Sequence, residues 1–387
     1  MSERRLLALV GSVVFVDTMF YAVITPLLPT LAHQLHLSRL SAGLLTASYA
    51  AGTLVGSIPG GILAVRAGPR LTVCAGLTLL ACSTVGFAWL RTIGWLDAAR
   101  VVEGVGGACS WAGGLAWIAA GQPPQRRGAM IGRALAAAIG GSLLGPAIGA
   151  LATVAGRQAL FTALASVVIA LIVLTRAMPA PTASAQAAGG TLRHALGRPR
   201  VVGAIWLMAL PAIVSGMINV IGPLRLHRLG ASAVAIGATF LIGAAIEAAI
   251  SPAVGGLSDR HGRIAPLRAG LLVTTAALLC FTAPERAVLL AFVIVALASA
   301  LGACWAPAMA MLADAGDALG LDQGLAAALM NLAWAGGQIV GAAGGGALAK
   351  LSGDGAPTIA AAALCGATAL ALTVGRSAPA PRPSRPR

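Results

Sequence analysis

The chain has 387 residues, of which 58% are hydrophobic and only 10% are charged, and its mean hydropathy is +0.90. Soluble globular proteins carry about 25% charged residues, so this composition excludes a soluble enzyme, a disordered protein and a nucleic-acid binder despite the net charge of +15. Apolar segments recur along the whole chain, which also excludes a lone signal peptide. With about 20 apolar residues per span, the chain has room for about twelve transmembrane helices.

We therefore predict an all-α polytopic membrane protein whose transmembrane helices lie at residues 6–30, 41–64, 71–91, 95–120, 128–153, 157–176, 201–223, 232–256, 266–283, 286–313, 323–349 and 356–375. Most joins are short, so consecutive helices should be antiparallel neighbours. The longer polar interval at 177–200 divides the chain into an N-terminal six-helix bundle at 1–176 and a C-terminal six-helix bundle at 201–375. The Pro- and Arg-rich tail at 376–387 should be disordered.

Basic residues are distributed unevenly between the two sides of the predicted membrane. If the N terminus is inside, 18 Arg residues fall on its side, against six Arg and one Lys on the other. The positive-inside rule then places both termini and the 177–200 linker in the cytoplasm. We expect a multi-pass protein of a bacterial cytoplasmic membrane, monomeric, with the lipid bilayer, protons and a small molecule as partners and no nucleic acid.

The two halves of the sequence repeat each other. The segment from Gly61 to Gly68 recurs as Gly255 to Gly262, 194 positions later. Pro26 in the first helix has a counterpart in Pro223 of the seventh. The fifth and eleventh helices each carry glycines four residues apart, at Gly141, Gly145 and Gly149 and at Gly337, Gly341 and Gly345. Two six-helix repeats predict two pseudo-symmetric bundles with a transport site between them.

Three motifs resemble those of the major facilitator superfamily, specifically its twelve-helix drug/proton antiporters. The fifth helix fits that family's antiporter motif with Gly132, Gly141, Gly145, Pro146 and Gly149, although Ala150 replaces its last glycine. The stretch from Arg100 to Ala108 resembles the helix-4 motif. The first helix, with Phe15-Val-Asp17-Thr-Met19 and then Thr25-Pro26-Leu-Leu-Pro29, is similar to that of vesicular amine transporters and related exporters. The resemblance covers essentially the whole chain.

The loop after the second helix departs from the family pattern. Val65 stands where the family has Asp, and Pro69 replaces a basic residue. The gating-loop residues that remain are Arg66, Gly68 and Arg70, and in the intact copy after the eighth helix Asp259, Arg260, Gly262 and Arg263. The resemblance implies that this loop locks the cytoplasmic side, so a weakened first copy should favour the inward-open state.

Four ionisable residues lie well inside the predicted spans, where charge is costly and usually functional. Asp17 is about 16 Å along the first helix, near the midplane. Arg100 and Glu103 are three residues apart on one face of the fourth helix. Glu247 falls near the middle of the eighth helix. We predict that these four serve proton coupling or substrate binding.

Each candidate has a structural alternative. Asp17 could be hydrogen-bonded between helices, Arg100–Glu103 could be a neutralising pair, and Glu247, on a face of small residues, could pack against the glycine ladder of the fifth helix, as the resemblance implies. The ladders are expected to be packing surfaces on which the two halves move. Cavity candidates are Tyr21, Met208, Met217, Asn219, Trp305, Asn331, Trp334 and Gln338.

No cofactor or metal site is predicted. The five histidines lie in loops or near helix ends without ligand spacing, and the six cysteines read as buried, unpaired residues. No P-loop is present, so ATP is not the energy source.

The leading hypothesis is proton-coupled efflux of a small amphipathic molecule. A symporter or facilitator for a sugar or metabolite is the alternative, and a membrane-embedded enzyme using Asp314 and Asp317 is a remote one.

Overall fold

The computed structural model describes residues 3–121, 124–179, 197–317 and 323–374. The predicted 177–200 linker lies largely, and the predicted tail entirely, outside these residues. The first bundle comprises α1 (Glu3–Gln34), α2 (Arg39–Arg66), α3 (Pro69–Trp89), α4 (Ile93–Gly121), α5 (Pro124–Ala155) and α6 (Arg157–Ala177). The second comprises α8 (Pro199–Arg228), α9 (Ala233–His261), α10 (Ile264–Leu279), α11 (Ala287–Asp317), α12 (Gln323–Ile339), the π-turn η1 (Val340–Gly344), α13 (Gly345–Ser352) and α14 (Gly355–Val374).

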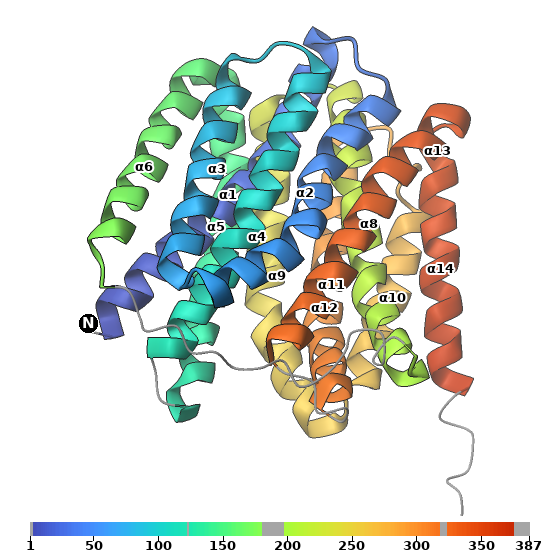
Figure 1. Ribbon diagram of the computed structural model, residues 1–387. Coiled ribbons are helices and arrows are strands. Elements are labelled where there is room, and N and C mark those ends of the chain that lie inside the picture. The colour runs from blue at the N-terminus through green and yellow to red at the C-terminus, as the bar shows by residue number, and fades with distance from the viewer. Residues whose placement is uncertain (1–2, 122–123, 180–196, 318–322, 375–387) are drawn as a thin grey trace, which may run out of the picture.

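The described residues thus form twelve helical spans, with α12, η1 and α13 as one span, and the predicted fold is confirmed (Figure 1). Nine of the helices are long and apolar enough to cross a membrane. The other three spans do not meet this criterion of length and hydropathy. The helix α4 carries the charged residues Asp97, Arg100 and Glu103, α10 has only 16 residues, and the span of α12 and α13 is interrupted by η1.

Both bundles are all-helical and run between the same two ends of the molecule. The end at which α1 begins and α14 finishes is called the terminal end here, and the opposite one the far end (Figure 1). Each bundle has its own apolar core, one built mainly from residues 6–178 and the other from residues 204–372. Val220 and Ala342 of the second bundle pack into the first core, so the bundles are in apolar contact.

The internal repeat extends to the details of the turns. Ser38 and Ser232, 194 positions apart, cap α2 and α9 by accepting a hydrogen bond from the backbone N–H three residues later. Gly68 and Gly262, with the same spacing, have φ angles of 89° and 87°. Only glycine adopts this backbone region readily, so the shared glycine of the two loops is required by the turn itself.

The glycine ladders are packing surfaces, but they lie inside each bundle. Gly141 and Gly145 have no room for a side chain because the backbone of Phe15 and Met19 in α1 is in the way. Gly341 meets α8 in the same manner. The expectation that the two bundles move over these ladders is therefore wrong, because the ladders join α1 to α5 and α8 to α12–α13 within single bundles. Such small residues let membrane helices approach closely.

The cysteines differ in part from the expectation. All six are unpaired, and Cys74, Cys109, Cys304 and Cys365 are buried. Cys82 of α3 and Cys280, the residue after the end of α10, are exposed.

Two alanine substitutions in α5 test the role of the ladder. Gly141→Ala inserts a methyl group against the α1 backbone, so it should destabilise the protein by about 1–3 kcal/mol. Gly132→Ala in the same helix meets open space and removes a flexible helix position, so it should be neutral or slightly stabilising. Thermal unfolding of the purified proteins measures both. Equal melting temperatures for the two variants would contradict the packing role.

Candidate functional site

Asp17 of α1 is completely buried and held by two aromatic side chains. Its carboxylate accepts hydrogen bonds from the Tyr49 hydroxyl of α2, at 3.1 and 3.2 Å, and from the Trp111 indole of α4, at 2.9 Å. Aromatic residues with a polar tip suit this position, since the ring is apolar and the donor is directional. The carboxylate is thus fixed at the centre of the first bundle.

Arg100 and Glu103 of α4 form a buried ion pair in the same bundle. Arg100 Nη1 lies 2.8 Å from Glu103 Oε1, and the two side chains are 1% and 6% exposed. The guanidinium also donates to the backbone carbonyls of Phe20 at 3.1 Å and Tyr21 at 3.3 Å. Its carbon lies 5.1 Å from the centre of the Tyr49 ring, a distance suited to a cation–π contact. The predicted pair therefore exists and is anchored to α1.

Tyr49 joins the two features into one cluster, which we call the buried charge cluster: Asp17, Tyr49, Arg100, Glu103 and Trp111. It contains two carboxylates and one permanent cation, so only one acid can be fully balanced by charge. The second acid can be neutral by holding a proton. This arrangement can bind and release a proton inside the membrane-spanning part of the protein.

Sequence reasoning missed Tyr49 and Trp111. A signal was available, since Tyr49 is one of two tyrosines in the chain, and a buried hydroxyl needs a partner. Gly107 of the helix-4 motif explains how the cluster fits. A side chain at Gly107 would collide with the Asp17 carboxylate and the Tyr49 hydroxyl, so this glycine makes room for the acid.

Tyr21 connects the buried charge cluster to the second bundle. Its ring lies 5.1 Å from Tyr49 and 5.3 Å from Trp334 of α12, centre to centre. Asn219 of α8 lies close to its hydroxyl. Three predicted cavity residues therefore meet where the bundles face each other.

The other cavity candidates are dispersed. Gln338 is buried and donates to Ser215 of α8 at 2.8 Å. Met208 and Met217 are buried in the second core, Met217 against Gly345. Asn331 is half-buried in α12. Of these four, Gln338 and Met217 contribute to the packing of α8 against α12 and α13.

Glu247 lies in the second bundle, on a different helix pair from the one expected. It packs on Gly302 of α11, and Trp305 of the same helix lies close to its carboxylate. The expectation that it faces the α5 glycine ladder is wrong, because Glu247 packs on α11 while the ladder glycines of α5 face α1. Gly243, one turn before Glu247, also faces α11, so this side of α9 belongs to its own bundle.

The gating-loop residues lie at the terminal end. Val65, Arg66 and Arg260 are exposed, and Arg70 donates to the carbonyl of Met178 at 3.1 Å. Arg263 forms an ion pair with Asp314 at the end of α11. The side chain of Asp259 lies outside the described residues, as do those of Asp317 and Asp322.

The far end carries an ion cluster that the sequence did not reveal. Asp354, just before α14, is buried and surrounded by three arginines: Arg39 Nε at 2.9 Å, Arg225 Nη1 at 3.7 Å, and Arg228, which also pairs with it. Arg39 is the first residue of α2, whereas the other two belong to α8. The Arg39–Asp354 pair therefore joins the two bundles at the far end.

The contacts around this pair are close. A side chain at Gly43 of α2 would collide with the backbone of Ala342 and Gly346, and Gly237 of α9 has no room beside Pro146 of α5. Both contacts lie toward the far end and connect the two bundles. The described residues thus hold the bundles together at that end.

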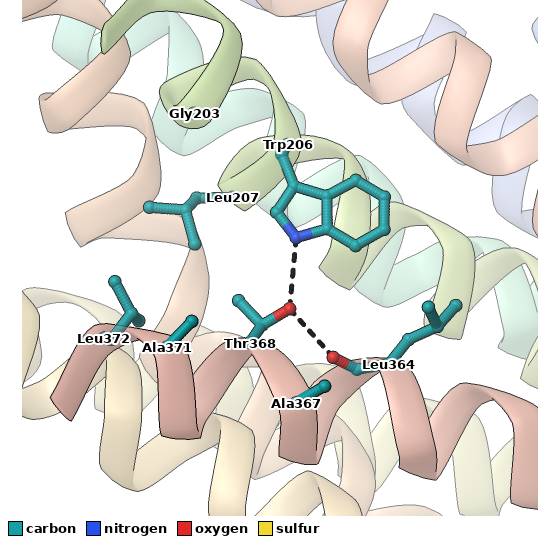
Figure 2. A pocket seen from close by; sticks show the side chains of 8 residues that line it. All are labelled: Gly203, Trp206, Leu207, Leu364, Ala367, Thr368, Ala371 and Leu372. Atoms are coloured by element: carbon teal, nitrogen blue, oxygen red, sulfur yellow. Dashed lines mark hydrogen bonds between the residues drawn. The ribbon is translucent and has the colours of Figure 1, made fainter. Parts of the chain in front are cut away.

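A separate cavity of about 380 Å³ lies between α8 and α14. Figure 2 shows its lining, in which Trp206 donates to Thr368 at 3.1 Å and Thr368 donates to the carbonyl of Leu364 at 2.8 Å. Its remaining lining residues are Gly203, Leu207, Ala367, Ala371 and Leu372. None of the lining residues is ionisable, and the cavity involves other helices than the buried charge cluster, so we do not assign it as the transport site.

Two curated transporters are similar in sequence to parts of this chain. The quinolone resistance protein NorA of Staphylococcus aureus (strain MRSA252) is 30% identical over 160 residues, which are 41% of each chain. A probable vesicular acetylcholine transporter-B of Danio rerio is 34% identical over 190 residues, 46% of this chain and 38% of that protein. The chain thus spans about two fifths of the length of the curated relatives it matches.

Solved structures share the fold over nearly the whole chain. A D-xylose–proton symporter superposes with a TM-score of 0.75 at 19% identity, covering 95% of this chain and 96% of that one. A bacterial homologue of the human lysosomal transporter Spinster, in an inward-facing and occupied conformation, superposes with a TM-score of 0.80 at 15% identity, covering 96% of both chains. The sequence profile of the Major Facilitator Superfamily matches residues 10–284 and 212–387. This chain therefore belongs to the Major Facilitator Superfamily of membrane transporters.

Proposed function

We propose that this protein is a proton-coupled exporter of a small amphipathic molecule that works by alternating access. The observation that carries the proposal is the buried charge cluster, in which two carboxylates share one arginine. Charges at this depth are expensive, so exchange of a proton is the chemistry that this arrangement favours. The matches to NorA and to a vesicular acetylcholine transporter support export.

The second candidate is a proton-coupled symporter or facilitator for a sugar or metabolite, which the likeness to the D-xylose–proton symporter suggests at the level of fold. Efflux from inverted membrane vesicles separates the two. An exporter accumulates fluorescent amphipathic dyes in these vesicles when their lumen is acidic, and a sugar symporter does not.

We further propose that the terminal end faces the cytoplasm, that the far end faces outward and that the protein acts as a monomer in a bacterial cytoplasmic membrane. The excess of arginine on the terminal side supports this orientation. The moving units would be residues 1–176 and 201–375, connected by 177–200. In this orientation the Arg39–Asp354 pair would close the outward side, and the inward-open preference expected from the weakened loop at Val65 stays a prediction.

Asp17→Asn tests the proton-binding role. The amide has nearly the same size and can still accept hydrogen bonds from Tyr49 and Trp111, so yield and melting temperature should stay near those of the wild type. It cannot exchange a proton, so pH-driven dye efflux should be abolished. Glu285→Gln, which changes an exposed acid between α10 and α11, is the control and should transport. Undiminished efflux by Asp17→Asn would remove this residue from the mechanism.

Arg100→Ala and Glu103→Gln test whether the pair acts as a unit. Without Arg100, Glu103 is buried with no cation and should stay protonated. Transport should then stop or lose its dependence on external pH, which a pH series of efflux rates measures. Glu103→Gln should impair the same dependence. Normal pH profiles in both variants would leave the pair a purely structural role.

Arg39→Gln tests the far-end contact. A partly exposed ion pair contributes about 0.2–1 kcal/mol, so its loss should raise the open-state population by up to about five-fold. Val220→Cys, on a cysteine-free background, reports the opening because Val220 is buried against the first bundle. Arg228→Gln removes the same charge from within the second bundle and should change labelling less. Equal labelling of wild type and Arg39→Gln would refute the contact as a determinant of state.

A further inference from the structure

The fourth helix places an acid on each side of its buried arginine. Asp97, Arg100 and Glu103 are spaced three residues apart, and residues with this spacing are neighbours on a helix surface. Glu103 is the present partner of Arg100, at 2.8 Å. Asp97 lies toward the far end, about 4.5 Å of helical rise from Arg100. Both carboxylates are therefore within reach of the same long side chain.

Two buried atoms on this stretch lack partners. Within the described part of the chain, neither Arg100 Nε nor Asp97 Oδ1 makes a hydrogen bond. Ser48 of α2 lies close to the Asp97 carboxylate, but its hydroxyl donates to the backbone carbonyl of Leu44 at 2.8 Å. Unpaired buried polar groups are unfavourable, so a state in which the guanidinium meets Asp97 would satisfy both atoms at once.

The surroundings couple Arg100 to the second bundle. The titratable groups that face this stretch of α4 are Asp17 and Tyr21 from α1 and Tyr49 from α2. The carbonyl of Tyr21 accepts a hydrogen bond from Arg100, while the ring of the same residue contacts Trp334 of α12. Separation of the bundles at this level would move Tyr21 and loosen its hold on the guanidinium.

We propose that Asp97 is the alternate partner of Arg100, so that the guanidinium pairs with Glu103 when the far end is closed and with Asp97 when it is open. In the second arrangement Asp17 and Glu103 have lost their cation and hold protons. Return of Arg100 to Glu103 favours release of a proton. Asp97 is thus a positioning residue that decides which buried acid is balanced. The link to proton movement rests on the proposed function, but the change of partner does not.

Opposite conformational shifts test the change of partner. Asp97→Asn confines Arg100 to Glu103 and should lower labelling of Val220→Cys at least five-fold. Glu103→Gln confines Arg100 to Asp97 and should raise it by a similar factor. Asp97→Glu retains a carboxylate and should return labelling toward the wild-type level. Glu285→Gln removes an exposed acid between α10 and α11 and serves as the control.

The outcomes separate this inference from the proposed function. Opposite shifts with rescue by Asp97→Glu support the change of partner, because a loss of packing alone would not move the two variants in opposite directions. Unchanged labelling in Asp97→Asn, or shifts of both variants in the same direction, overturns it. Wild-type efflux at a rate independent of pH would refute proton coupling, but it would not affect the conclusion drawn from the cysteine labelling.

Discussion

The arrangement of the first bundle depends on one buried guanidinium. Arg100 connects α4 to the backbone of α1 and to the ring of Tyr49 on α2, and it balances one of two nearby acids. A cation in this position is tolerated because two backbone carbonyls, one carboxylate and one aromatic face surround it, although its Nε has no acceptor. Removal of any one partner leaves the others with an uncompensated charge, so these residues constrain one another.

Close helix contacts make that arrangement possible. Gly107 leaves the space that Asp17 and Tyr49 occupy, and Gly104 meets the α2 backbone at Tyr49. Substitution of either glycine would separate α2 from α4 and stretch the hydrogen bonds of the buried charge cluster. In this protein the glycines of α4 therefore set the distances on which the electrostatics depends.

The sequence predicted the twelve spans, the repeat and the Arg100–Glu103 pair, because each depends on local hydropathy or on spacing within one helix. It identified Asp17 from its depth alone. It could not identify Tyr49 or Trp111 as partners, nor Asp354 as the acid that joins Arg39 to α8, because these contacts depend on which helices are neighbours and how each is rotated. Glu247 shows the same limit: its depth was evident, but its orientation toward α11 was not.

The far-end cluster has one further property. Asp354 has two arginines of its own bundle, so it remains neutralised when Arg39 moves away, and the contact can open without leaving a buried charge alone. The departing Arg39 side chain is 33% exposed already and passes readily into water. In contact, the partly buried pair is screened little by mobile ions, whereas exposed charges more than about 10 Å apart are largely screened at ordinary ionic strength. Salt therefore weakens the attraction that draws a separated Arg39 back more than it weakens the closed contact itself.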